Sequence, residues 1–210
     1  MASALIHLAI AKNLLKDLNI KNQKDFLLGS IAPDLSKQIG LNRIDSHFLI
    51  HTQEDVPNIN IFINKYRDFK NNAFDLGYFV HLYTDKLWFH GFLDNFICNS
   101  SIKLLDGTII QTTKDEMRNM IYSDYTNMNI KIIENYDLDL SLFYEEFQIP
   151  KTTINEIPID KLDILINQMG ILNENSKEEK SYTIDINLVN SFIETASKEI
   201  LQKLKALEEI

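Results

Sequence analysis

The sequence predicts an all-α fold, a bundle of several helices. Apolar residues recur at intervals of three and four along most of the chain, the spacing that gathers them on one face of a helix. A strand-like pattern is confined to residues 103–110, where Asp106-Gly107 joins two short β-favouring triplets. Hydrophobic residues make up 45% of the 210 residues, which is enough to bury a core. We therefore expect a single helical domain.

The first half of this domain, about residues 1–98, contains the more informative helices. They are predicted over residues 2–18, 22–29, 55–70 and 73–98. Gly29 fits the end of the second helix, and Pro33 prevents its continuation. Pro57 fits the first turn of the third.

The second half, about residues 112–210, reads as an accessory set of helices. Thr113 and Glu116 form a capping box for a helix that reaches about Tyr136, with Asp124 in its middle as a solvated or tyrosine-bonded carboxylate. A short helix follows Asp160 and ends near residue 170. The polar run 173–183 is predicted as an exposed loop, and a long amphipathic helix runs from about residue 184.

Charge and cysteine content restrict the classes of function. The chain has 21 basic and 30 acidic residues, a net charge of −9, which repels phosphate backbones and disfavours a nucleic-acid partner. The single cysteine, Cys98, excludes an internal disulfide and suits a reducing compartment. Neither a signal peptide nor a stable membrane anchor is predicted, so we expect a cytoplasmic protein. The sequence does not fix the oligomeric state.

His81 and Asp85 are the most chemically informative pair. They lie four residues apart in GYFVHLYTDKLW, and residues at this spacing share one face of a helix. An imidazole and a carboxylate presented together are either a hydrogen-bonded core pair or two ligands for one metal ion. Because the neighbouring side chains are apolar, the Asp85 carboxylate is costly to bury unless a positive group meets it.

His7, Asp34 and His47 are the other candidates, and each has an ordinary structural explanation. His7 lies among aliphatic residues and can be a core histidine with one hydrogen-bond partner. Asp34 can cap the element that follows it. His47 and His51 have the spacing of two metal ligands, but HFLIH lacks the glutamate of the HExxH metalloprotease signature, so that class is not supported.

The joint occurrence of these residues favours a metal site. The five candidate imidazole and carboxylate groups all fall within the first 85 residues, and helix bundles build metal sites from facing helices in this way. The predicted ligands are His7, Asp34, His47, His81 and Asp85, and the predicted cofactor is a divalent metal ion.

Four segments carry a resemblance to a known family. They are HLAIA around His7, LLGSIAPD ending at Asp34, SHF containing His47, and GYFVHLYTDKLW with His81 and Asp85. In this order they resemble the zinc-dependent phospholipase C and P1 nuclease superfamily, especially its short bacterial intracellular members. The resemblance covers about residues 1–95, and the combination of IAPD, SHF and HxxxD is more specific than any one of them.

The resemblance implies an all-helical fold in which zinc ions line one cleft and phosphoester bonds are hydrolysed. Asp34, His47, His81 and Asp85 would hold the first metal ion. Asp85 would bridge to a second ion, which His7 also binds, and Asp34 would orient or deprotonate the attacking water. The implied substrate is a small-molecule or lipid-derived phosphoester.

The sequence also departs from the family pattern. Extracellular members bind metal through a processed N-terminal tryptophan, whereas this sequence begins Met1-Ala2. Their third metal ion needs a further histidine and then a His-x3-acid pair. His90 lies near the first of these positions, but no histidine follows it, and on an unbroken helix it would point ~140° away from Asp85. We therefore expect a centre of one or two metal ions.

Two functional hypotheses remain. The first is a metal-dependent phosphoester hydrolase that acts through metal-activated water, with Asp34 as the catalytic residue. The alternative is a non-catalytic helical module with a residual structural or binding metal site; an open coordination position distinguishes the first from the second. An HD-type phosphohydrolase would need an adjacent His-Asp dyad, which the chain lacks.

Overall fold

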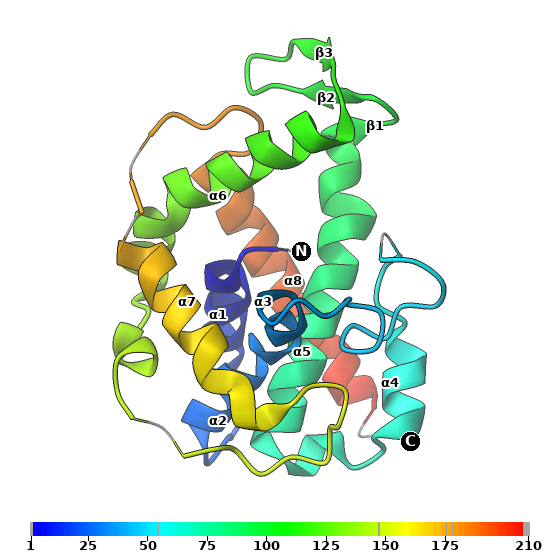
Figure 1. Ribbon diagram of the computed structural model, residues 1–210, viewed down its shortest axis with the longest axis vertical. Coiled ribbons are helices and arrows are strands. Elements are labelled where there is room, and N and C mark those ends of the chain that lie inside the picture. The colour runs from blue at the N-terminus through cyan, green and yellow to red at the C-terminus, as the bar shows by residue number, and fades with distance from the viewer. Residues whose placement is uncertain (1, 54, 147, 175, 178, 208–210) are drawn as a thin grey trace.

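The fold is all-α, as predicted, with one small sheet at one end (Figure 1). The computed structural model describes residues 2–53, 55–146, 148–174, 176–177 and 179–207. The helices are α1 (Ala4–Leu14), α2 (Gln23–Gly29), α3 (Leu35–Gln38), α4 (Ile59–Lys65), α5 (Ala73–Leu87), α6 (Lys114–Tyr136), α7 (Leu162–Glu174) and α8 (Ile186–Ala206). The short helical turns are η1 (Ala32–Asp34), η2 (Phe69–Asn71), η3 (Trp88–Phe92), η4 (Leu93–Asn95), η5 (Leu140–Phe143) and η6 (Ile159–Lys161).

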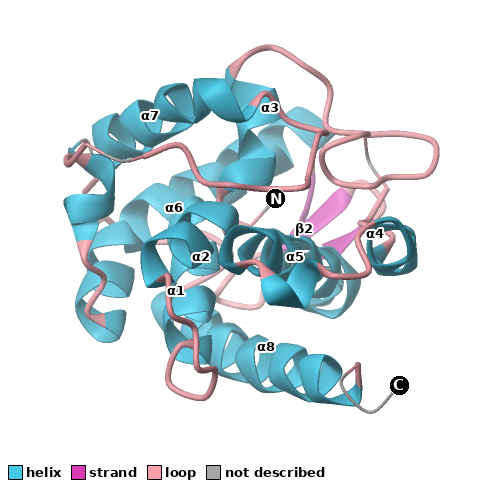
Figure 2. Cartoon of the chain, turned by 90° about the horizontal axis from the view of Figure 1, so that it is seen from below, coloured by secondary structure: helices cyan, strands magenta, loops and turns pink. Residues whose placement is uncertain are grey.

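The central element is α5, around which the other helices are arranged (Figures 1 and 2). It contacts α1, α2, α4 and α8, as well as the turn η1. Every residue from 74 to 85 is buried, including both ionisable candidates on this helix. An α-helix that is buried all round needs partners for its polar side chains as well as for its apolar ones.

Two glycines allow α2 to approach α5 closely. A Cβ atom on Gly29 would lie 2.1 Å from the carbonyl oxygen of Phe74, and a Cβ atom on Gly77 would lie 2.1 Å from that of Phe26. No side chain fits at either position, so the two backbones touch. This contact carries the end of α2, and with it Ser30, to the middle of α5.

The predicted helix 73–98 is wrong in its second half. The α-helix ends at Leu87, and the chain leaves helical geometry at His90 and Gly91, where Gly91 has φ 115°. Such a φ is accessible to glycine and breaks the helix. Just before the break, the buried ring of Trp88 packs against Phe92 at 4.4 Å and against Phe192 of α8 at 4.9 Å between ring centroids.

Other helix boundaries differ from the prediction because local capping decides them. The third predicted helix, 55–70, shrinks to α4, since Asn58 caps its start by accepting hydrogen bonds from the backbone N–H groups of Asn60 and Ile61. The first predicted helix, 2–18, ends at Leu14. The helix predicted to end near Gly170 continues as α7 to Glu174.

The sheet is slightly larger than the predicted hairpin. Strands β2 (Ser101–Lys103) and β3 (Ile109–Gln111) pair antiparallel with Ile102 opposite Ile110, and β1 (Ile97–Cys98) adds a third strand. The Thr113–Glu116 capping box at the start of α6 is confirmed.

Asp124 is not solvated, and its carboxylate is bonded to backbone N–H groups rather than to a tyrosine hydroxyl, which corrects the prediction. It is fully buried, and its carboxylate accepts hydrogen bonds from the backbone N–H groups of Tyr182, Thr183 and Ile184. These bonds attach the end of the predicted exposed loop to α6, and Thr183 is buried. The role of Asp124 is therefore structural.

Candidate metal centre

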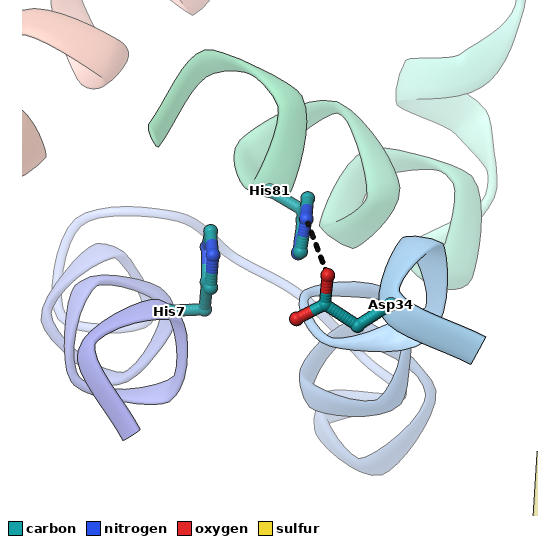
Figure 3. A group of neighbouring side chains, drawn as sticks. All are labelled: His7, Asp34 and His81. Carbon is teal, nitrogen blue, oxygen red and sulfur yellow. Dashed lines mark ion pairs between the residues drawn. The ribbon is translucent and has the colours of Figure 1, made fainter. Parts of the chain in front are cut away.

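The structure brings the five predicted ligands together from four segments. His7 comes from α1, Asp34 from η1, His47 from the turn before α4, and His81 and Asp85 from α5. Four of these side chains have no exposed surface, and Asp34 is 6% exposed. Figure 3 shows His7, Asp34 and His81: the two imidazole rings face each other, and the carboxylate points toward His81.

Two imidazole nitrogens form the middle of this group. Nε2 of His47 lies 3.3 Å from Nε2 of His81. Oδ1 of Asp34 lies 3.4 Å from the first nitrogen and 3.8 Å from the second. Oδ2 of Asp85 lies 3.7 Å and 3.9 Å from the same two nitrogens. Zinc bonds of ~2.0–2.2 Å in tetrahedral geometry place two donor atoms ~3.3–3.6 Å apart, so these spacings suit ligands of one ion.

Hydrogen bonds at the far side of each ring hold these two nitrogens toward the centre. Nδ1 of His81 lies 2.8 Å from the carbonyl oxygen of Ser30, which the close contact between α2 and α5 places there. Nδ1 of His47 lies 2.9 Å from Oγ of Ser46, which in turn lies 2.8 Å from Oγ of Ser36. Partners of this kind fix the tautomer and orientation of metal-binding histidines.

The two oxygens of Asp85 face different partners. Oδ1 accepts a hydrogen bond from the backbone N–H of Ala2 at 2.9 Å and lies 3.5 Å from Nε2 of His7. Oδ2 faces His47 and His81 and accepts a hydrogen bond from Nη2 of Arg43 at 3.0 Å. This arrangement allows the Asp85 carboxylate to contribute one oxygen to each of two neighbouring metal positions.

Arg43 is a charged residue of the centre that sequence reasoning missed, as it missed Ser30 and Ser46. It lies 42 positions from Asp85 in the chain, and no motif marks it. The only available signal was general: a buried carboxylate on an apolar helix needs a positive partner, and Arg43 is that partner here. Its Nη1 also donates to the carbonyl oxygen of Gln53 at 3.1 Å, which fixes the guanidinium at the edge of the centre.

Several polar atoms at the centre are buried without a hydrogen-bond partner among the described residues. They are both ring nitrogens of His7 and Oδ1 of Asp34. The His7 ring instead stacks on His81, with centroids 3.8 Å apart and planes 8° from parallel. Unsatisfied buried donors and acceptors cost about 1–3 kcal/mol each. Imidazole nitrogens and carboxylate oxygens are zinc donors, so the residues present fit a metal ion.

The pKa shifts put these groups in the forms that bind metal. Burial would raise the pKa of Asp34, but His47 and the other nearby imidazoles lower it to about 2. The pKa of Asp85 is also well below its ordinary value, because nearby positive charge and His7 outweigh its burial. Burial lowers the pKa of His81 to about 3 and also lowers that of His47. At neutral pH the carboxylates are therefore ionised and these two imidazoles are neutral.

The structural alternatives for single residues do not hold. Asp34 makes no side-chain capping hydrogen bond and faces His47 instead. His7 contacts His81 and Asp85 and has no hydrogen-bond partner among the described residues. His51 is exposed, which excludes the pairing of His47 with His51. His90 is exposed as well, with Nδ1 3.9 Å from Oδ2 of Asp94.

Comparison with protein families decides the relationship. The family described as zinc dependent phospholipase C matches residues 6–206. The chain belongs to this family. The match confirms the resemblance seen in residues 1–95 and extends it through the C-terminal half. No curated protein and no solved structure matches the chain.

Membership in the zinc-dependent phospholipase C family places the chain among metal-dependent phosphoesterases. The cofactor of the family is zinc, and the buried groups His7–Asp34–His81 and His47–His81–Asp85 could each hold a metal ion. Among the described residues, no helix has both the length and the hydropathy needed to cross a bilayer.

Proposed function

We propose that this chain hydrolyses phosphoesters at a reduced centre of one or two divalent metal ions, with zinc as the natural ion. The observation that carries the proposal is Oδ1 of Asp34. This oxygen is buried, lacks a hydrogen-bond partner among the described residues, and lies within 3.8 Å of Nε2 of both His47 and His81. A purely structural carboxylate would be expected to have its hydrogen bonds satisfied.

The proposed ligands divide according to the two oxygens of Asp85. Asp34, His47, His81 and Oδ2 of Asp85 would hold one ion. His7 and Oδ1 of Asp85 would contribute to a second, which is why the proposed centre has one or two ions. Divalent ions bound there would supply Lewis acidity for a phosphoryl oxygen and would acidify water.

Asp34 is the proposed catalytic residue. Its low pKa keeps the carboxylate ionised at neutral pH, which allows Asp34 to orient a water molecule. Because so low a pKa makes it a weak base, it would accept a proton only from water that a bound metal ion had acidified. As that proton moves to Asp34, the water oxygen forms a bond to phosphorus and the ester P–O bond breaks. The departing oxygen then takes up a proton from solvent, and Asp34 releases its own proton to solvent, which restores the carboxylate. His47 and His81, both neutral, hold their positions through Ser46 and Ser30.

The proposed substrate is a small-molecule or lipid-derived phosphoester. The net charge of −9 still argues against a nucleic-acid substrate. A cytoplasmic location also remains a prediction, which the exposed Cys98 supports because an exposed free thiol suits a reducing compartment.

The test is hydrolysis of nitrophenyl phosphate and bis(nitrophenyl) phosphate by protein loaded with zinc or treated with a chelator. We expect turnover only with zinc. Asp34→Asn removes the proposed proton acceptor without changing core volume, and should lower kcat by at least about a hundredfold. Asp94→Asn removes an exposed carboxylate outside the centre and should keep the wild-type rate.

The alternative, a non-catalytic module with a residual metal site, has one observation in its favour. Apart from Asp34, the proposed ligands have no exposed surface, and Arg43 closes one edge of the centre. A zinc-loaded wild-type protein that leaves a broad panel of phosphoesters intact would decide for this module.

A further inference from the structure

A cavity of about 890 Å³ lies next to the metal centre. Its walls come from α3 and the segment after it, from the turns η3 and η4 with β1, and from the first half of α6. Four basic side chains line it: Lys37, Arg43, Lys114 and Arg118. The size is that of a site for a small molecule, since ligand cavities typically span about 300–1,000 Å³.

The charge of this cavity is opposite to that of the whole protein. The chain has 30 acidic and only 21 basic residues, yet none of the described residues that line the cavity is acidic. Positive side chains around a concave, low-dielectric wall reinforce one another and concentrate anions. The remaining wall is largely apolar and aromatic, with Phe89 and Met117 as examples. The cavity therefore suits a ligand with a negative group and an apolar part.

Contacts hold two of the cations against the aromatic wall. The ammonium of Lys37 lies 4.9 Å from the centre of the Tyr122 ring, and Nζ donates to the hydroxyl of the same tyrosine at 3.4 Å. The guanidinium of Arg43 lies 5.6 Å from the centre of the Phe89 ring. Charges held in this way lose less entropy when they bind an anion than freely moving side chains do.

Arg43 joins the cavity to the metal centre. Its side chain lines the cavity, while Nη2 donates to Oδ2 of Asp85. Nε of Arg43 is buried and has no hydrogen-bond partner among the described residues. Only the Arg43 side chain would therefore separate a molecule in the cavity from the proposed metal ligand Asp85.

We propose that this cavity binds the part of the substrate beyond the scissile bond, and that the substrate is a phosphoester with a second negative group and an apolar portion. This inference rests on the proposed function. Lys37, Arg43 and Arg118 would bind the second negative group, and the aromatic wall would cover the apolar portion. Asp85 and Asp115 offset part of the charge of Arg43 and Arg118, but the four basic side chains still disfavour a substrate with a cationic substituent.

The test compares nitrophenyl phosphodiesters whose second ester groups are of similar length and differ in charge. The three groups are carboxypropyl, butyl and trimethylammonioethyl. With zinc-loaded wild type, kcat/KM should be roughly fivefold higher for the carboxypropyl ester than for the butyl ester, and lowest for the cationic ester. Repeating the series with dihexanoylglycerol and with glycerol in place of nitrophenol compares two alcohols of similar leaving ability. A higher kcat/KM for the dihexanoylglycerol esters identifies a lipid source, and a higher value for the glycerol esters identifies a free ester.

Charge reversal in the cavity tests the assignment directly. Lys37→Glu and Arg118→Glu should each abolish the preference for the carboxypropyl ester over the butyl ester. Lys131→Glu is the matched control: Lys131 is exposed on the same helix as Arg118 but does not line the cavity, so this variant should keep the preference. Fastest turnover of the cationic ester, or an unchanged preference in both cavity variants, would overturn the proposal.

A binding measurement separates this proposal from the proposed function. Phosphinates carry carbon in place of both ester oxygens and cannot be hydrolysed, so calorimetry with zinc-loaded protein measures their binding alone. The carboxypropyl phosphinate should bind several-fold more tightly than the trimethylammonioethyl one, and Lys37→Glu should remove the difference. This result without any turnover would contradict the hydrolase and keep the cavity assignment. Equal binding, or no binding, of the two phosphinates would overturn the cavity assignment, whether or not esters are hydrolysed.

Discussion

Asp85 contacts the rest of the centre through both of its carboxylate oxygens. Oδ1 meets Ala2 and His7, and Oδ2 meets Arg43, His47 and His81. A fully buried carboxylate is stable only with such partners, because its charge is otherwise costly to remove from water. The same two-sided contact that stabilises the anion also gives it the geometry of a bridging ligand.

The depressed pKa of His81 leads to a prediction about acid stability. In metal-free protein the folded state keeps His81 neutral down to about pH 3, whereas the unfolded chain protonates it near pH 6.5. Between these two pH values the unfolded state therefore binds more protons than the folded state. The free energy of unfolding rises with pH in this range, and the contribution of His81 to it is lost as the pH falls below 6.5. Between pH 7 and pH 4.5 this loss amounts to roughly 2–3 kcal/mol from His81.

Urea unfolding in the presence of a chelator at pH 7 and pH 4.5 measures this loss. His81→Gln lacks the titrating group, so its stability should fall less over the same interval, even if it starts lower. His90→Gln, which changes an exposed histidine, should follow the wild type. Parallel curves for wild type and His81→Gln would contradict the prediction.

At the residue scale, the sequence was informative where a residue type is chemically unusual in its context. A histidine in an aliphatic helix, an aspartate after proline and an i,i+4 pair could all be read directly. Arg43, Ser30 and Ser46 could not, because their contribution depends on long-range contacts. Arg43 looks like any loop arginine until Asp85 lies 3.0 Å away.

At the scale of elements, the contact between α2 and α5 positions the centre. Gly29 and Gly77 let the two backbones meet, and this contact places the Ser30 carbonyl 2.8 Å from Nδ1 of His81. Periodicity predicted both helices, but it gave no reason to expect them to touch at glycines. Their spacing depends on which residues face each other after folding.

Gly77→Ala should therefore weaken the metal centre. The added Cβ would lie 2.1 Å from the Phe26 carbonyl oxygen and must push α2 away from α5. We expect a loss of roughly 1–3 kcal/mol in unfolding free energy from overpacking. Zinc affinity should also fall by about 10–100-fold, because the partner of His81 moves. Calorimetry with zinc and urea unfolding measure the two effects.

Gly107→Ala is the control that separates a loss of stability from a loss of zinc binding. Gly107 has φ 88° in the hairpin turn, and a Cβ there would meet nothing within 4 Å. The strained backbone should lower stability, but zinc affinity should stay at the wild-type value. If Gly77→Ala binds zinc as tightly as Gly107→Ala, the helix contact does not position the centre.

Helix ends were predicted less well than helices. The end of α5 depends on the left-handed conformation of Gly91, and the start of α4 depends on capping by Asn58 rather than on Pro57. Several residues in each region can cap or break a helix, and the sequence pattern does not rank them. By contrast, the capping box of Thr113 and Glu116 was predictable because both partners lie within one turn.

At the scale of the whole molecule, the centre brings side chains from segments between residue 7 and residue 85 into contact. A metal ion that binds only the folded protein should stabilise it by about 2.7 kcal/mol at one hundred times its Kd. For a chain of this length, chelation should then lower the melting temperature by roughly 5–10 °C. Differential scanning calorimetry with and without chelator gives this shift.

Two aspartate variants test whether the shift comes from this centre. Asp85→Asn removes the two-sided carboxylate, so chelator should leave its melting temperature nearly unchanged. Asp124→Asn also removes a buried carboxylate and should lower stability, because three backbone N–H groups lose their ionised acceptor. Its response to chelator should stay as large as in wild type. An equal response in both variants would place the stabilising metal elsewhere.

The whole fold was predictable as a class but not as an arrangement. The apolar spacing and the family resemblance indicated a helical bundle, and both are confirmed. The packing of α1 against α8 and the attachment of residues 182–184 to Asp124 join parts of the chain that are far apart in sequence. No local pattern contains this information.

The position of Trp88 has a practical consequence for spectroscopy. It is the single tryptophan of the chain, buried three residues after Asp85, and its ring contacts aromatic side chains of α6 and α8. Fluorescence excited at the red edge of protein absorption therefore comes from one indole at the junction of three helices. Its emission wavelength and quenching can follow zinc loading and helix separation in the unlabelled protein, in real time and at low concentration.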